Sequence, residues 1–471
     1  MIAATNAQCT QIAQSWAVNF DGAPDNDPWS AYTTPPGSVS GAQGVAITTN
    51  ALGADVPTRV FVTALFKSNV GGADIYTAAY DAGTGALVWE RTYNNTAVNG
   101  SDVPVKIVWS GGYVYVGGSS MGATPTGAST NLDYIVLRYS ATDGSSAAPW
   151  ASPFRYNNSP TNGADVLADL YVEGQVGGDP AGGVFGGGLY LYATGTSFDS
   201  ASKNDFLTVR VDLFDPSMWI EKRSNPAQFS TSSDVAVSMT YKAASPGEPG
   251  VFVTGYTNGI TGMNDDYWTV AYPLDLSAEL WSRSFDAGFA GSDQAVKVAY
   301  TAICGTPFCR GVVYVTGTAW RGIGRNYDIV TTAYDVHTGA DFWNPATIIF
   351  ENESTHGEDR ASDMLLDKFA DLYICGRSKN GSTFDMLAIS YNRLGGLRWV
   401  TPPPNPVYTD IYYNGVSNGD DFAGAIRVTS DGVISHNGEV FILGNTLGTL
   451  NGAPIKRYGL LRYTQTDVSC P

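Results

Sequence analysis

Short runs of β-branched and aromatic residues, separated by turn residues, fill the chain from end to end. Most runs are apolar at both alternating positions, and none shows the three-to-four-residue spacing of an amphipathic helix. One run recurs seven times, as VFVTA at 60–64, VYVGG at 114–118, LYATG at 191–195, VFVTG at 251–255, VYVTG at 313–317, LYICG at 372–376 and VFILG at 440–444. A repeat therefore underlies the fold.

Three further runs accompany most copies. An Asp-headed run precedes the copy, another Asp-headed run that usually closes on Tyr follows it, and a run that carries Trp comes last. The leading aspartates are Asp102, Asp165, Asp234, Asp293, Asp359 and Asp421, the following ones are Asp74, Asp133, Asp205, Asp266, Asp328 and Asp385, and the tryptophans are Trp89, Trp150, Trp219, Trp281, Trp343 and Trp399. With a period of about 60 residues, this unit predicts a four-stranded antiparallel sheet.

Strands that are apolar on both faces need cover on both faces. Radial packing of sheets supplies that cover, so we predict an all-β fold, a seven-bladed β-propeller of four-stranded antiparallel blades. A β-helix has shorter repeats and does not explain a unit of four runs. The predicted blades of this single domain, residues 1–471, are 42–94, 102–156, 164–224, 233–287, 293–350, 359–401 and 420–471.

The last unit lacks its Trp-bearing run, because the chain stops at Pro471. The N-terminal segment WAVNF at 16–20 copies WSRSF at 281–285. Residues 14–21 are therefore predicted to complete the last blade as its outer strand and to close the ring. This closure would bring Cys9 close to Cys470 and favours a disulfide between them.

The segments YYNGVSNGDDFAGAIRV at 412–428, VYVTG at 313–317, YDIVTTAYD at 327–335 and LRW at 397–399 resemble the bacterial β-propeller repeat family of secreted and surface-anchored proteins. The resemblance covers nearly the whole chain and implies the fold, but it supplies no catalytic residue. A weaker likeness to quinoprotein propellers rests on DAGTGALVW at 81–89 and DVHTGADFW at 335–343. Those enzymes carry an adjacent Cys pair at the cofactor, and this chain has none.

Charge and cysteine content restrict the partners and the compartment. With 26 Lys and Arg against 44 Asp and Glu, the net charge is −18, whereas nucleic-acid binding needs a cationic face. We expect no nucleic-acid partner and, without a long apolar run, no membrane span. The five cysteines lack zinc-ligand spacing and indicate an extracellular, secreted or cell-surface protein. Cys304 and Cys309 bracket a tight turn and are predicted to pair, and Cys375 is expected to be a buried free thiol.

The first and third strands of each blade begin at the same end, so both sets of aspartates should gather there. Carboxylates suit Ca²⁺, so calcium is a candidate cofactor, but each Asp also fits a turn in which it accepts backbone N–H groups. Recurrence in six units favours the structural interpretation, because a catalytic pair is normally unique. The candidate metal ligands are Asp21, Asp25, Asn26 and Asp27 in one loop without EF-hand spacing, and Asp293.

Six aromatic residues break the repeat and fall in connections at the acidic end: Trp29, Tyr256, Trp320, Tyr408, Tyr412 and Tyr413. An exposed ring there could stack on a sugar or anchor a partner chain, although single exposed aromatic residues are also ordinary. The three histidines, His337, His356 and His436, do not converge in the predicted blades, which argues against a three-His metal site.

Two classes of function stay open. The first is a non-enzymatic extracellular interaction or structural module that presents its loops to a protein or polysaccharide partner. It is favoured because the sequence contains no convergent histidines, no unique acid pair and no phosphate-binding loop. The alternative is a propeller enzyme that uses the acidic face, either glycosidase-like or a quinoprotein-like oxidoreductase. Self-assembly through divalent cations is a further hypothesis.

Overall fold

The structure of the chain is a computed structural model. It describes residues 8–20, 42–47, 59–67, 72–81, 86–123, 130–146, 148–158, 163–173, 190–199, 203–224, 233–258, 264–304, 309–352, 356–400, 410–414, 419–428, 438–450 and 453–469. The chain divides into two compact units: unit 1 is Met1–Asp21 with Phe285–Pro471, and unit 2 is Gly22–Ser284. The regular elements of the described residues are strands, and none of these residues forms a helix able to cross a membrane.

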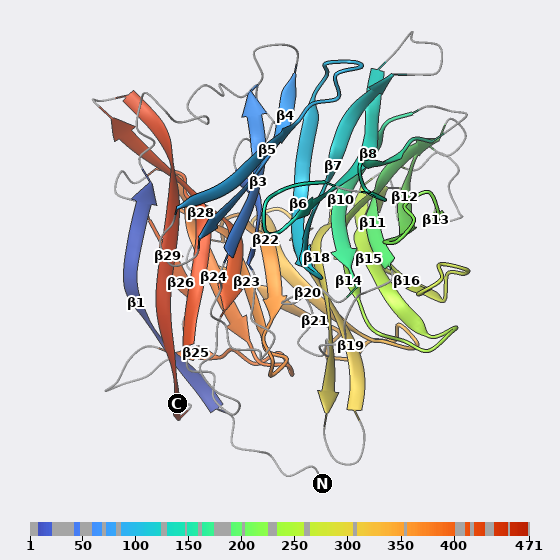
Figure 1. Ribbon diagram of the computed structural model, residues 1–471. Helices are drawn as coiled ribbons and strands as arrows, with labels where there is room; N and C mark the ends of the chain where they lie inside the picture. Colours follow the sequence, from blue (N-terminus) through green and yellow to red (C-terminus); the bar gives the residue numbers. More distant parts are fainter. Residues whose placement is uncertain are drawn as a thin grey trace. The chain divides into compact units, whose positions relative to one another are not determined.

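Four sheets, each named here after its first strand, make up the described part of unit 2 (Figure 1). In each sheet the four strands lie side by side in chain order. The strands are β2 (Ala42–Ile47), β3 (Arg59–Lys67), β4 (Ala73–Asp81) and β5 (Leu87–Tyr93); β6 (Asp102–Ser110), β7 (Tyr113–Ala123), β8 (Thr130–Ser140) and β9 (Phe154–Tyr156); β10 (Asp165–Val172), β11 (Tyr190–Asp199), β12 (Lys203–Asp212) and β13 (Trp219–Ser224); and β14 (Asp234–Tyr241), β15 (Pro249–Asn258), β16 (Asp265–Pro273) and β17 (Trp281–Phe285). Unit 2 thus consists of repeated four-stranded meanders.

The described part of unit 1 contains three sheets. The first two are β18 (Gln294–Cys304), β19 (Cys309–Trp320), β20 (Tyr327–Asp335) and β21 (Thr347–Phe350); and β22 (Asp359–Leu366), β23 (Leu372–Asn380), β24 (Thr383–Tyr391) and β26 (Ile411–Tyr413). The third runs in the order β27 (Phe422–Val428), β28 (Gly438–Leu450), β29 (Ala453–Ser469), β1 (Gln8–Phe20) and β25 (Trp399–Val400).

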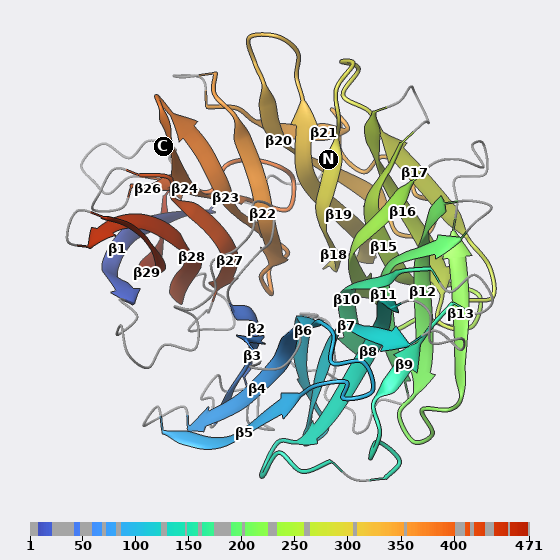
Figure 2. The same cartoon turned by 90° about the horizontal axis from the view of Figure 1, so that it is seen from above.

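Within each unit, successive sheets pack face to face through their apolar strands. One core cluster joins Tyr314 and Ala333 of the β18 sheet to Met364 and Ile374 of the β22 sheet, and all four are buried. Figure 2 shows β10, β11, β12 and β13 side by side in their order. These are the blades of a β-propeller, which confirms the predicted fold class. The closed ring of seven blades stays a prediction.

The recurring glycine of the repeated run is explained by a β-bulge in the inner strand. In the β22 sheet the register shifts between Ala361 and Asp363, opposite Gly376. A Cβ atom built on Gly376 would lie 1.9 Å from the carbonyl oxygen of Arg360, which is too close for any side chain. The same shift occurs opposite Gly195 and Gly255, so the glycine is needed wherever the bulged carbonyl approaches it.

The N-terminal strand completes the last blade, as predicted. β1 pairs antiparallel with β29 from Gln8 opposite Ser469 to Phe20 opposite Tyr458, and it is longer than the expected residues 14–21. Cys9 pairs through its backbone with Val468, two residues before Cys470. The side chain of Cys9 and all of Cys470 lie outside the described residues, so their disulfide stays a prediction. Cys304 and Cys309 do form a disulfide, and Cys375 is free and buried.

The outer edge of the β22 sheet differs from the expected one. Trp399 was predicted in the fourth strand of this blade, but the fourth strand is β26, at Ile411–Tyr413. Trp399 instead belongs to β25, which pairs in parallel with β1 through Thr10 opposite Trp399. A bare outer edge of β1 would offer unpaired N–H and C=O groups to another chain, and β25 covers part of that edge.

Candidate functional site

The repeated aspartates that head the inner strands hold the loop before them. In Asp165, Oδ2 accepts the backbone N–H of Asn158 at 2.8 Å and Oδ1 accepts the hydroxyl of Ser197. Asp359 repeats the loop contact with the N–H of Asn352, also at 2.8 Å. Burial, opposed by these hydrogen bonds, raises the pKa of each of the two carboxyls to about 6. The contacts support a structural role for this set.

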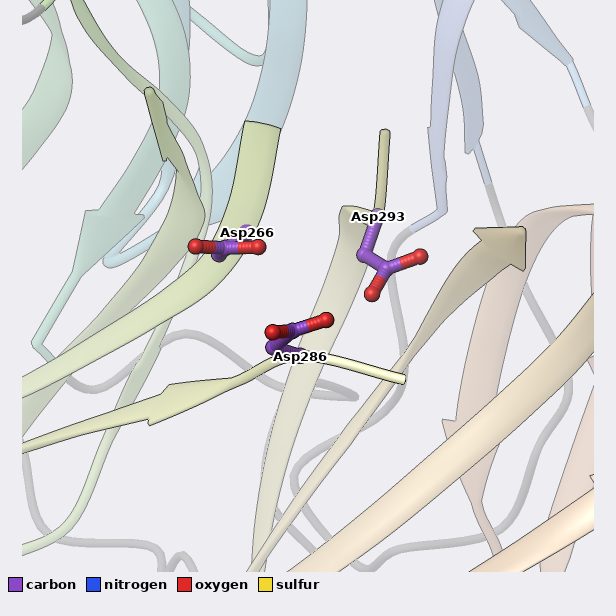
Figure 3. A group of neighbouring side chains, drawn as sticks. All are labelled: Asp266, Asp286 and Asp293. Carbon is purple, nitrogen blue, oxygen red and sulfur yellow. The ribbon is translucent and has the colours of Figure 1, made fainter. Parts of the chain in front are cut away.

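Asp293, one of the predicted metal ligands, has the same structural contacts. Its Oδ2 accepts the N–H of Ala287 at 2.6 Å and its Oδ1 accepts the N–H of Trp320 at 2.8 Å. A carboxylate oxygen of the exposed Asp286 lies within 4.8 Å of one of Asp293, and Asp286 itself accepts the N–H of Gly288 (Figure 3). Asp266, drawn in the same figure, belongs to unit 2 and is buried in β16. Calcium binding at Asp293 stays a prediction.

The aspartates of the third strands differ in their partners from sheet to sheet. Asp133 forms an ion pair with Arg155 at 2.7 Å. Arg155 lies in the fourth strand, opposite Ile135, which is two residues after the aspartate in the third strand. Arg223 occupies the same register position beside Asp205. In unit 1 this position holds other residues, Ile349 in the β18 sheet and Tyr412 in the β22 sheet.

Asp328 of the β18 sheet is consequently a buried carboxyl without a hydrogen-bond donor. It is 0% exposed, and neither oxygen has a hydrogen-bond partner among the described residues. The nearest cation is Arg321, whose Nε lies 3.8 Å from Oδ2. Burial, together with the charges of Glu351 and Asp359, raises the pKa of Asp328 to about 7 against the opposing charges of Arg321 and Arg325.

A second departure from the repeat lies at the same end of the β22 sheet. In the sheets with a leading aspartate, the first-strand residue that follows this aspartate pairs with the second-strand residue that follows the recurring glycine. In four other sheets these pairs are Val103 with Ser119, Val166 with Thr196, Val235 with Tyr256, and Gln294 with Thr318. In the β22 sheet the pair is Arg360 with Arg377. Like charges placed directly opposite each other destabilise a sheet unless another group offsets them.

The carboxylate that bonds to both arginines is Glu358, the residue before the leading Asp359, and the charge of Asp420 also acts on Arg377. Its Oε1 accepts a hydrogen bond from Nε of Arg360 and another, at 3.3 Å, from Nη2 of Arg377. Burial by itself would raise the pKa of Glu358, but the hydrogen bonds and charges of the two arginines lower it below its ordinary value. The side chains of both arginines are 31% exposed, although Nε of Arg377 is buried.

Aromatic rings hold the two arginines in place. The guanidinium of Arg360 lies 4.2 Å from the ring centre of Tyr327, and that of Arg377 lies 4.7 Å from Phe384 and 4.8 Å from Phe422. Tyr327 also packs edge to face against Trp320 at 5.0 Å. We call these residues the arginine–aromatic cluster: Trp320, Tyr327, Glu358, Arg360, Arg377, Phe384 and Phe422.

The cluster shares its end of unit 1 with an exposed apolar hairpin tip. Ile323, between β19 and β20, is 101% exposed and is flanked by Gly322 and Gly324, both at positive φ. Phe289 is also exposed, and Arg321 lies over its ring at 5.4 Å. Exposed Phe289 and the stacked arginines belong to the residue types that are enriched at protein interfaces, and Ile323 adds an exposed apolar side chain beside them.

Of the predicted ligand-binding residues, the structure places only Trp320 in this cluster. Tyr412 and Tyr413, expected in a connection, lie in β26 instead, because the outer strand of the β22 sheet is formed there; Tyr412 is exposed. Tyr256 is half-buried in β15 of unit 2. Trp29, Tyr408, Asp21, Asp25, Asn26 and Asp27 lie outside the described residues.

Sequence reasoning missed the residues that carry the charge of the cluster. Arg360, Arg377 and Glu358 follow the repeat in spacing and depart from it only in side-chain type. A comparison of the residue after each recurring glycine would have found Arg377 among Ser, Thr, Tyr and Asn. His356, considered as a lone histidine, does meet a carboxylate: its Nδ1 lies 2.7 Å from Oε1 of Glu351.

No known protein family matches the chain, and no curated protein matches it. Among solved structures, the quinohemoprotein alcohol dehydrogenase ADHIIG from Pseudomonas putida HK5 is 11% identical over 86% of this chain, with a TM-score of 0.40; the match spans 65% of that enzyme. Sqt1 from Chaetomium thermophilum is 12% identical over 92% of this chain and 97% of its own, also at 0.40. The Bombyx mori GH32 beta-fructofuranosidase BmSUC1 is 8% identical over 88% of each chain, at 0.29. Similarity this distant indicates no activity, and membership of the bacterial repeat family stays a prediction.

Proposed function

We propose that the chain is a non-enzymatic, extracellular β-propeller protein that binds a protein partner through the arginine–aromatic cluster and the neighbouring hairpin tip at Ile323. The observation that carries the proposal is the departure from the repeat at Arg360 and Arg377. Residues that recur in every blade serve the fold, whereas residues that interrupt the pattern at one exposed place are free to serve binding.

A protein partner fits this surface better than a polysaccharide does. A sugar ring stacks on the open face of an aromatic side chain, but the guanidinium groups of Arg360 and Arg377 already lie over Tyr327, Phe384 and Phe422. An acidic polysaccharide would in addition be repelled by the net charge of −18. A protein supplies an apolar pocket for Ile323 and only a few carboxylates for the arginines.

One observation favours the enzymatic alternative. The charge of Glu351 acts on Asp328, and a carboxyl with a pKa of about 7 suits the general acid of a glycosidase. Asp328 is, however, completely buried, so a substrate does not reach it. The quinoprotein likeness is weaker, because Asp335 of the DVHTGADFW motif accepts the N–H groups of His337 and Thr338 in its own turn. We therefore favour binding over catalysis.

Site-specific photocrosslinking tests the proposal. A photoreactive residue is placed at Ile323 or, as a control in the same unit, at Leu394, which is 72% exposed in a hairpin at the opposite strand ends. After irradiation with the surface-protein fraction of the source cells, we expect one discrete protein adduct from position 323 and none from 394.

The adduct should disappear when Arg377→Ala is added to the variant labelled at position 323. A carbohydrate adduct would contradict the assignment of a protein partner. Equal labelling from both positions would contradict the proposed surface. Release of reducing sugar from oligosaccharides by the purified chain, lost in Glu351→Gln, would support the enzymatic alternative instead.

A further inference from the structure

We infer that Arg360 and Arg377 form a carboxylate-binding site, that Glu358 occupies this site in the unbound chain, and that a carboxylate of a protein partner replaces Glu358 there. The inference rests on the proposed function and specifies its chemistry. It concerns three residues whose contacts all lie within unit 1.

The two guanidinium groups converge on a single acceptor atom. Both donate to Oε1 of Glu358, Arg360 through Nε and Arg377 through Nη2. In the described part of the chain, Nη1 and Nη2 of Arg360 and Nη1 of Arg377 donate no hydrogen bond. Nε of Arg377 is buried without a partner. The pair therefore has several N–H donors left for a second, better-placed oxygen acceptor.

The arginines are held in position before any ligand binds. The guanidinium of Arg360 lies over the ring of Tyr327, and that of Arg377 lies over the rings of Phe384 and Phe422. An arginine immobilised by ring stacking loses little further side-chain entropy when it binds an anion. The planar fork of N–H groups matches the two oxygens of a carboxylate.

Glu358 is suited to leave the site. It precedes β22, and its backbone carbonyl accepts the N–H of Lys379 at 2.9 Å, so only the side chain has to move. That side chain is 27% exposed. When Glu358 swings into solvent, it exchanges its bonds to the two arginines for bonds to water, and the incoming carboxylate restores the neutralisation of the opposed pair. Glu358 is thus an internal competitor that lowers the affinity for weak or incorrect ligands.

The experiment uses the full chain and three defined probes. Acetyl-Ala-Phe-Glu-amide carries one carboxylate, acetyl-Ala-Phe-Gln-amide is its neutral match, and glucuronate represents an acidic polysaccharide. Affinities are measured at 0.15 M salt by NMR titration of the arginine Nε–H signals, and the unfolding midpoint of every variant is recorded beside them.

We expect the Glu peptide to bind and the Gln peptide to bind at least fivefold more weakly. Glu358→Gln should tighten the Glu peptide at least fivefold, because it removes the competitor. Asp341→Asn is the matched control: it removes the same charge at an exposed position elsewhere in unit 1 and should change the affinity less than twofold. Arg377→Gln and Arg360→Gln should each weaken binding at least fivefold, and either variant suffices if the other does not fold.

Three results would overturn the inference. Equal tightening by Glu358→Gln and Asp341→Asn would mean that only the net charge matters. Equal binding of the Glu and Gln peptides would remove the carboxylate from recognition. Tighter binding of glucuronate than of the Glu peptide would assign the site to an acidic polysaccharide. The crosslink from position 323 separates this inference from the proposed function. If the crosslink persists although the carboxylate or the charge at Glu358 proves unimportant, the protein-binding surface stands and only the carboxylate-binding site is wrong.

Discussion

Asp328 illustrates how the loss of one partner changes a repeated carboxylate. Its counterparts Asp133 and Asp205 have an arginine from the fourth strand, whereas Ile349 takes that position beside Asp328. The pKa of Asp328 is about 7, and those of Asp165, Asp359 and Asp410 are about 6, chiefly because burial disfavours the charged form. These folded-state values lie above those of an unfolded chain. Their contribution to stability is therefore complete below the unfolded pKa of about 4 and is lost as the pH rises through 6 to 7.

We predict that Asp328→Asn stabilises the chain at pH 8 and leaves its stability at pH 4.5 nearly unchanged. The amide cannot ionise, so the variant avoids the burial of a charge that the wild type bears above pH 7. The gain at pH 8 should be on the order of 1–3 kcal/mol. Urea unfolding at the two pH values measures it, with the exposed Asp286→Asn as the control. A loss of stability at pH 8 would show that the ionised carboxylate of Asp328 has a stabilising partner.

The strands follow from the repeat because each repeated residue has a local physical task. The glycine makes room for the bulged carbonyl, and the threonine before it shares a hydroxyl hydrogen bond with the third strand, as in Thr316 with Thr331 at 2.9 Å. The repeat did not predict that β26, rather than β25 with Trp399, forms the fourth strand of the β22 sheet. The segment at Trp399 carries the same signature as the other outer strands, and its position is decided by the uncovered edge of β1, which belongs to a distant part of the chain.

The register of β1 with β29 leads to a prediction about the two terminal cysteines. Residue 9 pairs with residue 468, and we predict that Cys9 and Cys470 form a disulfide. By the chain-entropy estimate, a link across nearly the whole chain stabilises it by about 4–6 kcal/mol. Peptide mapping without reductant should find the two terminal peptides joined and Cys375 labelled only after unfolding. Free thiols at both Cys9 and Cys470 would contradict the prediction.

The chain as a whole carries a charge of −18, and this shapes its choice of partner. A strongly acidic protein repels polyanions over distances of about a Debye length, roughly 8 Å at physiological salt. Within unit 1, Arg360 and Arg377 form a local exception that only a partner in close contact can use. The fold class was predictable because it depends on a pattern repeated many times. The cluster was not, because its residues become neighbours only through the register of two strands and the packing of adjacent sheets.

The most direct test compares a repeated arginine with a repeat-breaking one. Arg155 pairs with the buried Asp133, and Arg377 pairs with the half-buried Glu358. For Arg155→Ala and Arg377→Ala, the unfolding free energy and the affinity for acetyl-Ala-Phe-Glu-amide are measured on the same samples. We predict that Arg155→Ala lowers stability by on the order of 2 kcal/mol and leaves the affinity unchanged. Arg377→Ala should weaken binding at least fivefold and cost less than about 1 kcal/mol of stability. The opposite assignment, with binding lost in Arg155→Ala and only stability lost in Arg377→Ala, would contradict a binding surface at the arginine–aromatic cluster.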